Sequence, residues 1–179
     1  MKGQNRNFAV MIDSRIVDFI GEHHVLTVAC ASRQAAGAPA SSLELWCANA
    51  FYVFDPQEEA FIITSEAKTR HAQLFLENPQ VTGSIVLETE TVGMIRGLQF
   101  SGIVRRCESG LFDRCRLRYL KRFPYAVFKG GEVWLIIPDK MKYTDNRLGF
   151  GKKLLWEKEM PGQAGHDDDM ISGHDSEGD

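Results

Sequence analysis

Apolar runs of strand-like composition, separated by short turns, constrain the fold of this chain more than any other feature. Short connections join neighbouring runs and helices do not alternate with them, so the sheet is expected to be mainly antiparallel. No GxGxxG or Walker sequence occurs, which disfavours a doubly wound nucleotide-binding fold. The predicted fold is therefore mainly β, of the α+β or small-barrel type. The predicted strands are Val25–Ser32, Ser42–Phe54, Ala60–Thr64, Gln80–Glu88, Val92–Cys107, Glu132–Ile137 and Met141–Thr144. Outside the strands, a corner is predicted at Pro138–Lys140 and an apolar patch at Leu154–Trp156.

The longest predicted strand, Val92–Cys107, contains Gly93, Gly97 and Gly102. Glycine inside a strand marks a bulge, a bend or the close approach of another backbone. Gly97 and Gly102 therefore predict a tightly curved strand, as in a small barrel. Arg96 interrupts the apolar pattern of this strand. From the pattern alone, this arginine is either an exposed charge or a side chain that points into a site.

Two segments show helical periodicity, Met11–Glu22 and Leu111–Phe123, and Asp13 or Ser14 could cap the first of them. The second helix has an apolar side and a basic side. We interpret the basic side as a solvated cationic face, in preference to an RNA-binding surface. The basic residues are Arg114, Arg116, Arg118, Lys121 and Arg122.

Charge is unevenly distributed along the chain. Six of the 24 acidic residues and none of the 21 basic residues follow Met160, so the remainder has about three more bases than acids. This mildly basic body suits an anionic cofactor and is too weakly basic to indicate nucleic-acid binding. We predict a flexible N-terminus at residues 1–10, one domain at residues 11–158 and a disordered acidic tail at residues 159–179.

The four cysteines form no CxxC pair, and none has a histidine nearby at zinc-ligand spacing. The adjacent His23 and His24 are interpreted as residues at a helix end rather than as metal ligands. The polar N-terminus argues against a signal peptide, and no apolar run is long enough to span a membrane. These features predict a cytoplasmic protein with reduced thiols, no metal site and no membrane partner.

The segment Phe61–Pro79 is predicted to pass from a strand into a helix, with Ser65 as the helix N-cap. Hydroxyl groups, unpaired backbone N–H groups and cations at a helix start suit a phosphate group. A surface helix with a solvated basic patch is the alternative interpretation of the same residues. The phosphate candidates are Thr64, Ser65, Lys68, Arg70 and His71.

The order of these elements resembles that of the FMN-binding split-barrel superfamily, the pyridoxamine 5'-phosphate oxidase-like proteins. More narrowly, the motifs LWCANAFYVFD, KTRHAQ, IRGLQFSG, KRFP and TDNRLGFGKK resemble the uncharacterised bacterial YhbP-like branch. The resemblance covers roughly Met11–Trp156. It implies a six-stranded antiparallel split β-barrel with flanking helices. It also implies a homodimer with FMN sites between the subunits, and a small-molecule substrate.

In proteins of this superfamily the hairpin strand, here Ala48–Val53, runs along the flavin ring, and the cationic turn holds the phosphate. The partner subunit contributes from its C-terminal segment. The implied cofactor-binding residues are Ala48, Asn49, Ala50, Phe51, Thr64, Ser65, Lys68, Arg70, His71, Arg96, Gln99, Asn146 and Lys152, with Lys153 as a further position.

The sequence departs from the oxidases of this superfamily in two places. They carry Arg-Gln on the long strand, whereas here Gly97 follows Arg96 and Gln99 comes two residues later. The C-terminal substrate-binding Arg and His of the oxidases have no counterpart, which argues against pyridoxine-phosphate oxidation. The leading hypothesis is an FMN-dependent oxidoreductase with no assigned catalytic residue, because the flavin itself supplies the hydride chemistry.

Two alternatives stay open at this point. The first is a non-catalytic flavin- or haem-binding sensor on the same fold. Haem would need an axial ligand, for which His23, His24 and His71 are the candidates. The second is a structural dimer with no cofactor.

Overall fold

The computed structural model describes residues 11–33, 43–128, 130–149 and 152–158. The predicted flexible N-terminus (1–10) and the predicted acidic tail (159–179) lie outside these residues. So does the segment 34–42, which its small, polar and Gly/Pro-containing sequence predicts to be a loop.

Seven antiparallel strands form one sheet, in the order β3-β2-β1-β4-β5-β6-β7. A further pairing between β3 and β6 closes the first six strands into a ring, and β7 lies outside the ring against β6. The prediction of a six-stranded split barrel is confirmed. The strands are β1 (Val25–Arg33), β2 (Leu43–Asp55), β3 (Ala60–Ser65), β4 (Gln80–Val86), β5 (Arg96–Arg106), β6 (Glu132–Asp145) and β7 (Lys153–Glu157).

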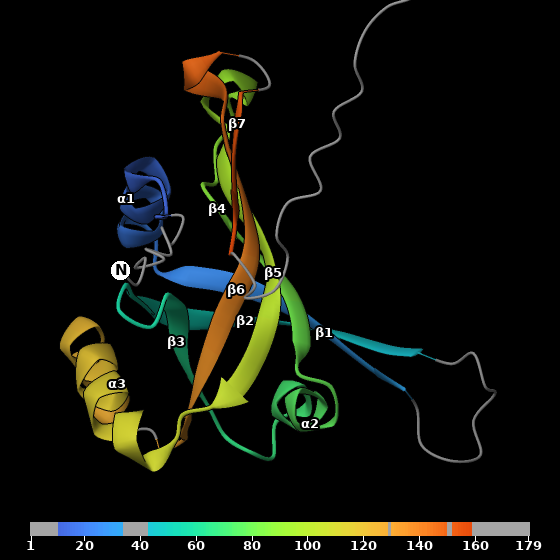
Figure 1. The fold of residues 1–179 in the computed structure, drawn as a ribbon, viewed down its shortest axis with the longest axis vertical. Coiled ribbons are helices and arrows are strands. Elements are labelled where there is room, and N and C mark those ends of the chain that lie inside the picture. The colour runs from blue at the N-terminus through green and yellow to red at the C-terminus, as the bar shows by residue number, and fades with distance from the viewer. Residues whose placement is uncertain (1–10, 34–42, 129, 150–151, 159–179) are drawn as a thin grey trace, which may run out of the picture.

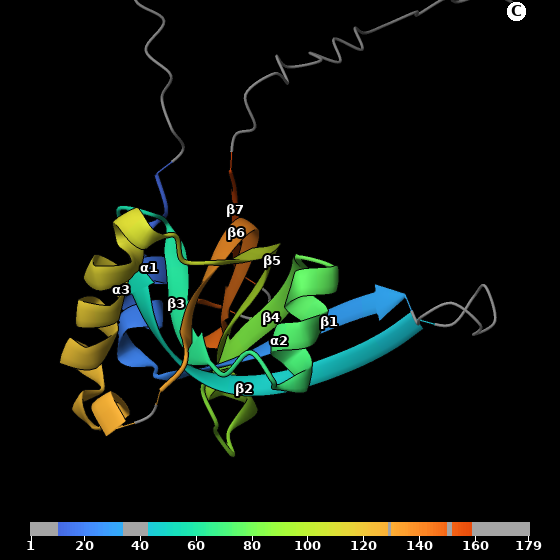
Figure 2. The same cartoon turned by 90° about the horizontal axis from the view of Figure 1, so that it is seen from below.

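Three α-helices surround the ring: α1 (Ser14–Glu22), α2 (Arg70–Glu77) and α3 (Ser109–Arg122). Figure 1 shows α1 and α3 on one side of the molecule and α2 on the other, and β1 and β2 extend past α2 as a two-stranded arm (Figure 2). Asp13 caps α1 as predicted, because its carboxylate accepts a hydrogen bond of 2.9 Å from the backbone N–H of Arg15.

Aromatic side chains fill the ring. Phe61 of β3 packs on Phe100 of β5 with ring centres 5.0 Å apart, and Tyr52 meets Phe61 edge-on at 5.4 Å. Both Phe61 and Tyr52 are fully buried. A second, smaller apolar cluster lies beneath α3, where Cys115 and Tyr119 are packed against the outside of β3 and β6. The ring thus has a core of its own, and α3 adds a separate layer.

Two strand boundaries differ from the prediction. Val92–Cys107 is not a single strand, because a short 3₁₀ turn, η1 (Val92–Met94), precedes β5. β6 is continuous through the predicted corner at Pro138–Lys140. The register between β5 and β6 shifts between Ser101 and Gly102, and Gly102 then stands opposite Pro138. This irregularity accommodates the proline without ending the strand.

The apolar patch at Leu154–Trp156 is part of a strand, β7, which pairs with the second half of β6. Trp156 is buried and Leu155 is exposed, as expected when side chains alternate across a strand. Two more 3₁₀ turns, η2 (Pro124–Phe128) and η3 (Asn146–Leu148), complete the described structure.

The basic side of α3 is not a simple solvated face, so that interpretation was wrong for three of its five residues. Arg118 and Arg114 bind Asp55, at N–O distances of 2.5 and 3.4 Å, and Asp55 is fully buried at the end of β2. Arg122 donates to the backbone carbonyls of Gly21 and His23 at the end of α1. These arginines fasten α3 to the body of the protein.

Candidate functional site

β2 and β3 part from one another partway along β2, and we call this divergence the split. The two strands pair only from Tyr52 to Asp55 on β2, opposite Ala60–Ile63 on β3. From Leu43 to Phe51, β2 pairs with β1 alone. In the described part of the chain, one backbone edge of this stretch therefore has no neighbouring strand. Beyond the split, β3 runs on to Ser65 and the chain then turns into α2.

Helix α2 begins at Arg70, and its N-cap is Thr69 rather than Ser65 as predicted. Ser65 is still the last residue of β3, where it stands opposite Glu132 of β6. A turn separates the two elements, closed by the backbone N–H of Thr69, which donates to the carbonyl of Glu66 at 3.0 Å. Sheet pairing thus holds Ser65 in extended geometry, and the helix starts five residues later.

Three polar side chains meet between the end of β3 and the start of α2. The Oγ of Ser65 lies 2.6 Å from Nε2 of His71 and 2.9 Å from Oγ1 of Thr69, and Thr69 Oγ1 lies 3.2 Å from the same nitrogen. We call these residues the Ser65–Thr69–His71 cluster. Sequence reasoning selected Ser65 and His71 and missed Thr69. A hydroxyl residue immediately before the Arg-His pair was the available signal.

The His71 ring is half-buried and tilted against Phe75, with ring centres 5.6 Å apart. Burial lowers the pKa of His71 from its ordinary value of 6.5. Burial thus favours the neutral form of the imidazole.

The two predicted cations flank this cluster, and each has an acidic partner. Arg70 donates from Nε to Glu44 Oε1 at 2.6 Å and from Nη2 to the other carboxylate oxygen. Lys68 Nζ lies 2.8 Å from Glu66 Oε2, with 84% of its side chain exposed. The hydrogen bond from Arg70 lowers the pKa of Glu44. Glu44 was not predicted, and it links β2 to the start of α2 across the split.

Thr64 precedes Ser65 on β3 and lies at the point where β2 and β3 part. The hydroxyl of Tyr119, from α3, donates to the backbone carbonyl of Phe51 at 3.4 Å. Burial raises the pKa of Tyr119, and a hydrogen bond with the Thr64 side chain acts in the opposite direction. Tyr119 thus contacts both strands near the point where they part.

The four predicted residues on β2 divide between its two faces. Asn49 and Phe51 are exposed on the outer side of the sheet, and Thr27 donates to the Asn49 side chain at 2.8 Å. Ala48 and Ala50 point inward and pack against the core. Only Asn49 and Phe51 therefore offer side chains on the outer face.

Arg96 lies far from the start of α2 within one chain. It stands opposite Asp145 at one end of β6, whereas Ser65 stands opposite Glu132 at the other end, roughly 40 Å away along the strand. Its side chain is 14% exposed, forms a 2.9 Å ion pair with Glu22 and lies 5.5 Å above the Phe19 ring. Arg96 is thus neither an exposed charge nor part of the α2 site, but a contact to α1.

The remaining predicted residues are also remote from the start of α2. Gln99 is exposed on the outer side of β5, opposite Ser84 of β4 and Lys142 of β6. Asn146 donates from its side chain to the carbonyl of Val92 at 2.9 Å, and Lys152 is exposed. Within one chain, the structure brings together Ser65, Lys68, Arg70 and His71, with Thr64 beside them.

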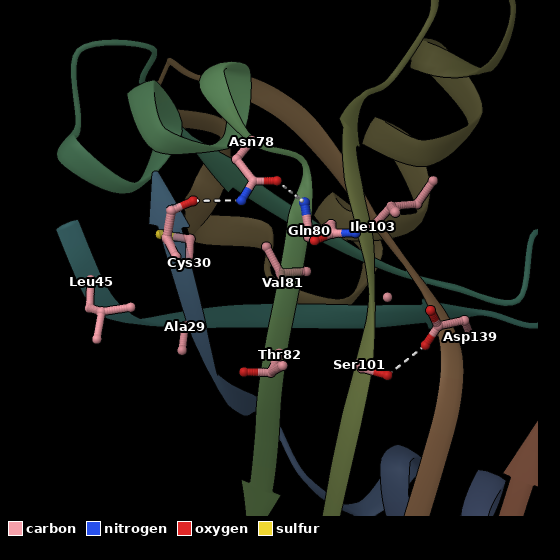
Figure 3. Close-up of a pocket in the computed structure, with 12 residues that line it drawn as sticks. Ala29, Cys30, Leu45, Asn78, Gln80, Val81, Thr82, Ser101, Ile103 and Asp139 are labelled. Atoms are coloured by element: carbon pink, nitrogen blue, oxygen red, sulfur yellow. Dashed lines mark hydrogen bonds between the residues drawn. The ribbon is translucent and has the colours of Figure 1, made fainter. Parts of the chain in front are cut away.

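A shallow cavity of about 380 Å³ lies on the outer side of β1, β4 and β5 (Figure 3). Its floor consists of small side chains, since Ala29, Thr82 and Ser101 are neighbours across the three strands. At one edge of the cavity, the Ser101 hydroxyl donates a hydrogen bond of 2.6 Å to the Asp139 carboxylate. The Leu45 side chain lines another edge. None of the predicted cofactor-binding residues lines this cavity. The residues that line this cavity form no recognisable sequence motif, so the cavity could not be predicted from the sequence.

Histidines, cysteines and carboxylates form no group of three suited to a metal ion in the described residues. His23 Nδ1 is 2.8 Å from the carbonyl of Phe19, and the exposed His24 lies 6.2 Å from the Phe123 ring. Among the residues that the structure describes, no helix is long and apolar enough to cross a membrane.

Two curated relatives show where the chain belongs by sequence. It is 45% identical over 141 residues to a UPF0306 protein of Klebsiella pneumoniae. This alignment covers 79% of this chain and 90% of that protein. It is 51% identical over 113 residues to the UPF0306 protein YhbP of Escherichia coli O157:H7. This second alignment covers 63% of this chain and 77% of that protein. No protein-family model matches the chain.

Three solved structures share the fold at low sequence identity. HutZ, a haem storage protein from Vibrio cholerae, has a TM-score of 0.58 and 18% identity over 83% of this chain and 96% of its own. An FAD-binding protein from Mesorhizobium loti has a TM-score of 0.55 and 9% identity over 75% of this chain and 95% of its own. A putative pyridoxamine 5'-phosphate oxidase from Listeria innocua has a TM-score of 0.50 and 14% identity over 73% of this chain and 95% of its own.

At these identities the structural neighbours establish the fold alone, whereas the curated relatives establish the family. The chain belongs to the UPF0306 family, which includes YhbP, and it has the split-barrel fold of the pyridoxamine 5'-phosphate oxidase-like proteins.

Proposed function

We propose that this protein binds FMN and acts as an oxidoreductase on a small molecule. One observation carries the proposal. The Ser65–Thr69–His71 cluster, with Lys68 and Arg70 beside it, lies at the start of α2, next to a stretch of β2 that pairs on one side only. These are the donors and charges that a phosphate monoester needs.

The start of α2 adds backbone donors to these side chains. The first N–H groups of a helix have no partner within it, and the helix dipole favours an anion there. Arg70 can offer a forked pair of N–H donors to phosphate oxygens, and Lys68 adds a mobile charge. The FAD-binding protein from Mesorhizobium loti shares this fold, which supports a flavin as the phosphate-bearing ligand.

We propose that two copies of the chain form a dimer, with the outer side of the sheet as the interface. Large apolar side chains are exposed on this side, with exposed fractions of 69% for Leu45, 45% for Ile103 and 73% for Leu155. Exposed apolar groups around a floor of small residues are typical of surfaces that bind another protein. In a dimer, Asn146 and Lys152 of one copy could reach the α2 site of the other.

Bound FMN would supply hydride transfer, and the protein would supply binding and orientation. In this proposal the start of α2 holds the phosphate, and the ring lies along the stretch of β2 from Leu43 to Phe51 that pairs with β1 alone. No general acid or base is assigned, because the substrate is unidentified and the flavin itself would supply the hydride chemistry.

A non-catalytic flavin- or haem-binding protein is the second candidate. The structural neighbour from Vibrio cholerae is a haem storage protein, and the exposed imidazole of His24 is the histidine most available to an iron atom. His23 and His71 each have a ring nitrogen in contact with another group, at 2.8 and 2.6 Å.

The visible absorption spectrum of the purified protein, before and after addition of FMN, tests the proposal. A flavin spectrum, and tighter binding of FMN than of riboflavin, are expected. Reduction by NAD(P)H with turnover would distinguish an enzyme from a binding protein. A haem band would favour the second candidate, and absence of colour with no FMN binding would refute both.

The double variant Lys68→Ala/Arg70→Ala tests the location of the site. Loss of both cations should weaken FMN binding at least tenfold and leave riboflavin binding unchanged, since charge-assisted hydrogen bonds contribute about 1.5–3 kcal/mol each. Arg116→Ala/Lys121→Ala removes the same charge from α3 and is the matched control. Equal FMN affinity in the two double variants would place the phosphate elsewhere.

A further inference from the structure

We infer that the site at the start of α2 takes up its phosphate together with a proton, and that His71 accepts this proton. The inference rests on the proposed phosphate site and adds a linkage between anion binding and pH.

The contacts of the Ser65–Thr69–His71 cluster fix where its hydrogens lie. The Thr69 hydroxyl has one hydrogen, which it donates to the carbonyl of Glu66 at 2.8 Å. Thr69 Oγ1 must therefore accept the hydrogen bond at its 2.9 Å contact with Ser65 Oγ, so the single hydroxyl hydrogen of Ser65 points to Thr69. Ser65 Oγ must in turn accept at the 2.6 Å contact, which requires a hydrogen on Nε2 of His71.

The hydrogen bonds therefore run in one direction, from His71 through Ser65 and Thr69 to the carbonyl of Glu66. Every other arrangement leaves at least one of these three hydrogen bonds without a hydrogen, and the longer 3.2 Å contact between Thr69 Oγ1 and Nε2 shares the Nε2 hydrogen. The 3.5 Å contact from Ser65 to the same carbonyl is too long to compete. In the neutral ring, Nε2 thus carries the hydrogen, and Nδ1 is free of one and can accept a proton.

The charged groups on the turn, on β2 and on β6 near His71 are each paired with another charge, and Glu77 at the end of α2 accepts a hydrogen bond of 2.6 Å from the Ser32 hydroxyl. Beside it on the turn and α2, Lys68 is paired with Glu66, and Arg70 with Glu44 of β2. Across β3 on β6, Glu132 lies opposite Ser65 and forms a 3.1 Å ion pair with Arg106 of β5. Burial is the single cause of the lowered pKa of His71. No charged group thus contributes to the lowered pKa, and a phosphate would bring a negative charge to the ring.

A phosphate dianion within hydrogen-bonding distance of the imidazole favours the protonated form, by about 1–3 pKa units. The proton comes from the solvent and adds to Nδ1, and Nε2 keeps its hydrogen. The Ser65 and Thr69 hydroxyls can then rotate from their present partners towards the phosphate oxygens. No covalent bond changes, and the ring gains one positive charge opposite the two negative charges of the anion.

The sign of the pH dependence follows from this exchange. The pKa of His71 is higher in the bound state than in the free state, so binding takes up a proton between the two values. In that interval, affinity should fall by up to about tenfold per pH unit as the pH rises.

The test is an NMR titration of the His71 ring with and without inorganic phosphate, followed by calorimetry of FMN binding in two buffers of different ionisation enthalpy. Phosphate should raise the pKa of His71 by at least about one unit. FMN binding should take up a fraction of a proton, and His71→Gln, which keeps an N–H donor but cannot titrate, should abolish the uptake. His24→Gln is the matched control and should keep it. Protonation of the phosphate itself is common to all variants and cancels in the comparison.

The results separate this inference from the proposed function. FMN binding without proton uptake, and with an unchanged pKa of His71, would overturn the inference and leave the flavin proposal standing. A raised pKa with phosphate, but no FMN binding, would support the inference and refute the flavin proposal. If neither FMN nor phosphate affects the protein, both are wrong. The wild-type titration decides the matter even if His71→Gln fails to fold.

Discussion

The guanidinium of Arg70 is held by the carboxylate of Glu44, a residue 26 positions earlier in the chain. This pair spans the split and joins β2 to the first residue of α2. An acidic group is therefore bound to the very cation that we propose as a phosphate ligand, and an incoming phosphate has to compete with it.

Replacement of Glu44 with Gln should tighten FMN binding by about two- to fivefold, because it removes a competing charge worth up to about 1 kcal/mol. Fluorescence titration of FMN measures the affinity. Glu90→Gln, which removes an exposed acid elsewhere, should leave the affinity unchanged. Weaker binding in Glu44→Gln would show instead that the carboxylate positions Arg70 for the phosphate.

Replacement of Asp55 with Asn should lower the free energy of unfolding by about 3 kcal/mol. Asp55 is fully buried and binds Arg118, Arg114 and the backbone N–H of Gln57. Removal of one partner from a buried ion pair typically costs about 3–5 kcal/mol, and here the arginines are partly hydrated. Urea denaturation followed by tryptophan fluorescence provides the measurement.

The control for Asp55 is Asp113→Asn, which removes an exposed acid from α3 and should change stability by less than about 0.5 kcal/mol. Equal stability of the two variants would mean that the contact between Asp55 and α3 contributes little.

Gly102 should not tolerate a side chain. A Cβ at this position would lie 2.2 Å from the carbonyl oxygen of Ile137 and 2.8 Å from the Cα of Pro138, and both are backbone atoms. Gly102→Ala should therefore destabilise the protein by about 1–3 kcal/mol, the usual cost of overpacking. Gly97→Ala is the control, because its Cβ would meet only one carbonyl oxygen, at 3.5 Å. Thermal and urea unfolding should separate the two variants, and similar stabilities would contradict this account of the irregularity in β5.

Asp145 should contribute to stability in a pH-dependent way. Hydrogen bonds from Arg147, together with one from Tyr143, hold the pKa of this buried carboxyl at about 2, below its ordinary value of 3.8. The folded state thus favours the ionised form, and the resulting stabilisation of about 2 kcal/mol is complete above the ordinary pKa. It is lost as the pH falls from about 4 towards 2.

Urea denaturation of Asp145→Asn between pH 7 and pH 3 tests this dependence. The variant should be less stable than the wild type at pH 7, and the difference should shrink as the solution becomes acidic. Asp18→Asn, which removes an exposed carboxylate from α1, should show no such convergence. A difference that stays constant with pH would assign the role of Asp145 to packing.

Local pattern was sufficient to predict most of the strands, because their composition and turns are local properties. It could not distinguish η1 from β5, since Val92 and Met94 continue the apolar run although the backbone turns there. Pro138 was expected to end a strand. The register shift at Gly102, which permits it, depends on a partner more than thirty residues away. β7 was missed because it has only five residues and is recognisable only beside β6.

The candidate site was predictable where it is continuous in sequence. Ser65, Lys68, Arg70 and His71 lie within seven residues, so one turn gathers them. Glu44 and Tyr119 come from distant segments, and only the folded ring brings them to the split. The resemblance to a family also selected Arg96, whose contacts to α1 no sequence pattern could indicate.

β6 pairs with β5 along most of its length, with β3 over its first half and with β7 over its second. This strand comes near the end of the described part of the chain. During synthesis on the ribosome, β1 to β5 emerge before β6. Ile62 of β3 therefore cannot pair with Leu135 of β6, the residue opposite it, until β6 has been made. The nascent chain therefore exposes an apolar strand edge while the 73 residues that follow Ile62, up to Leu135, are made, and an exposed edge of this kind can pair with other chains.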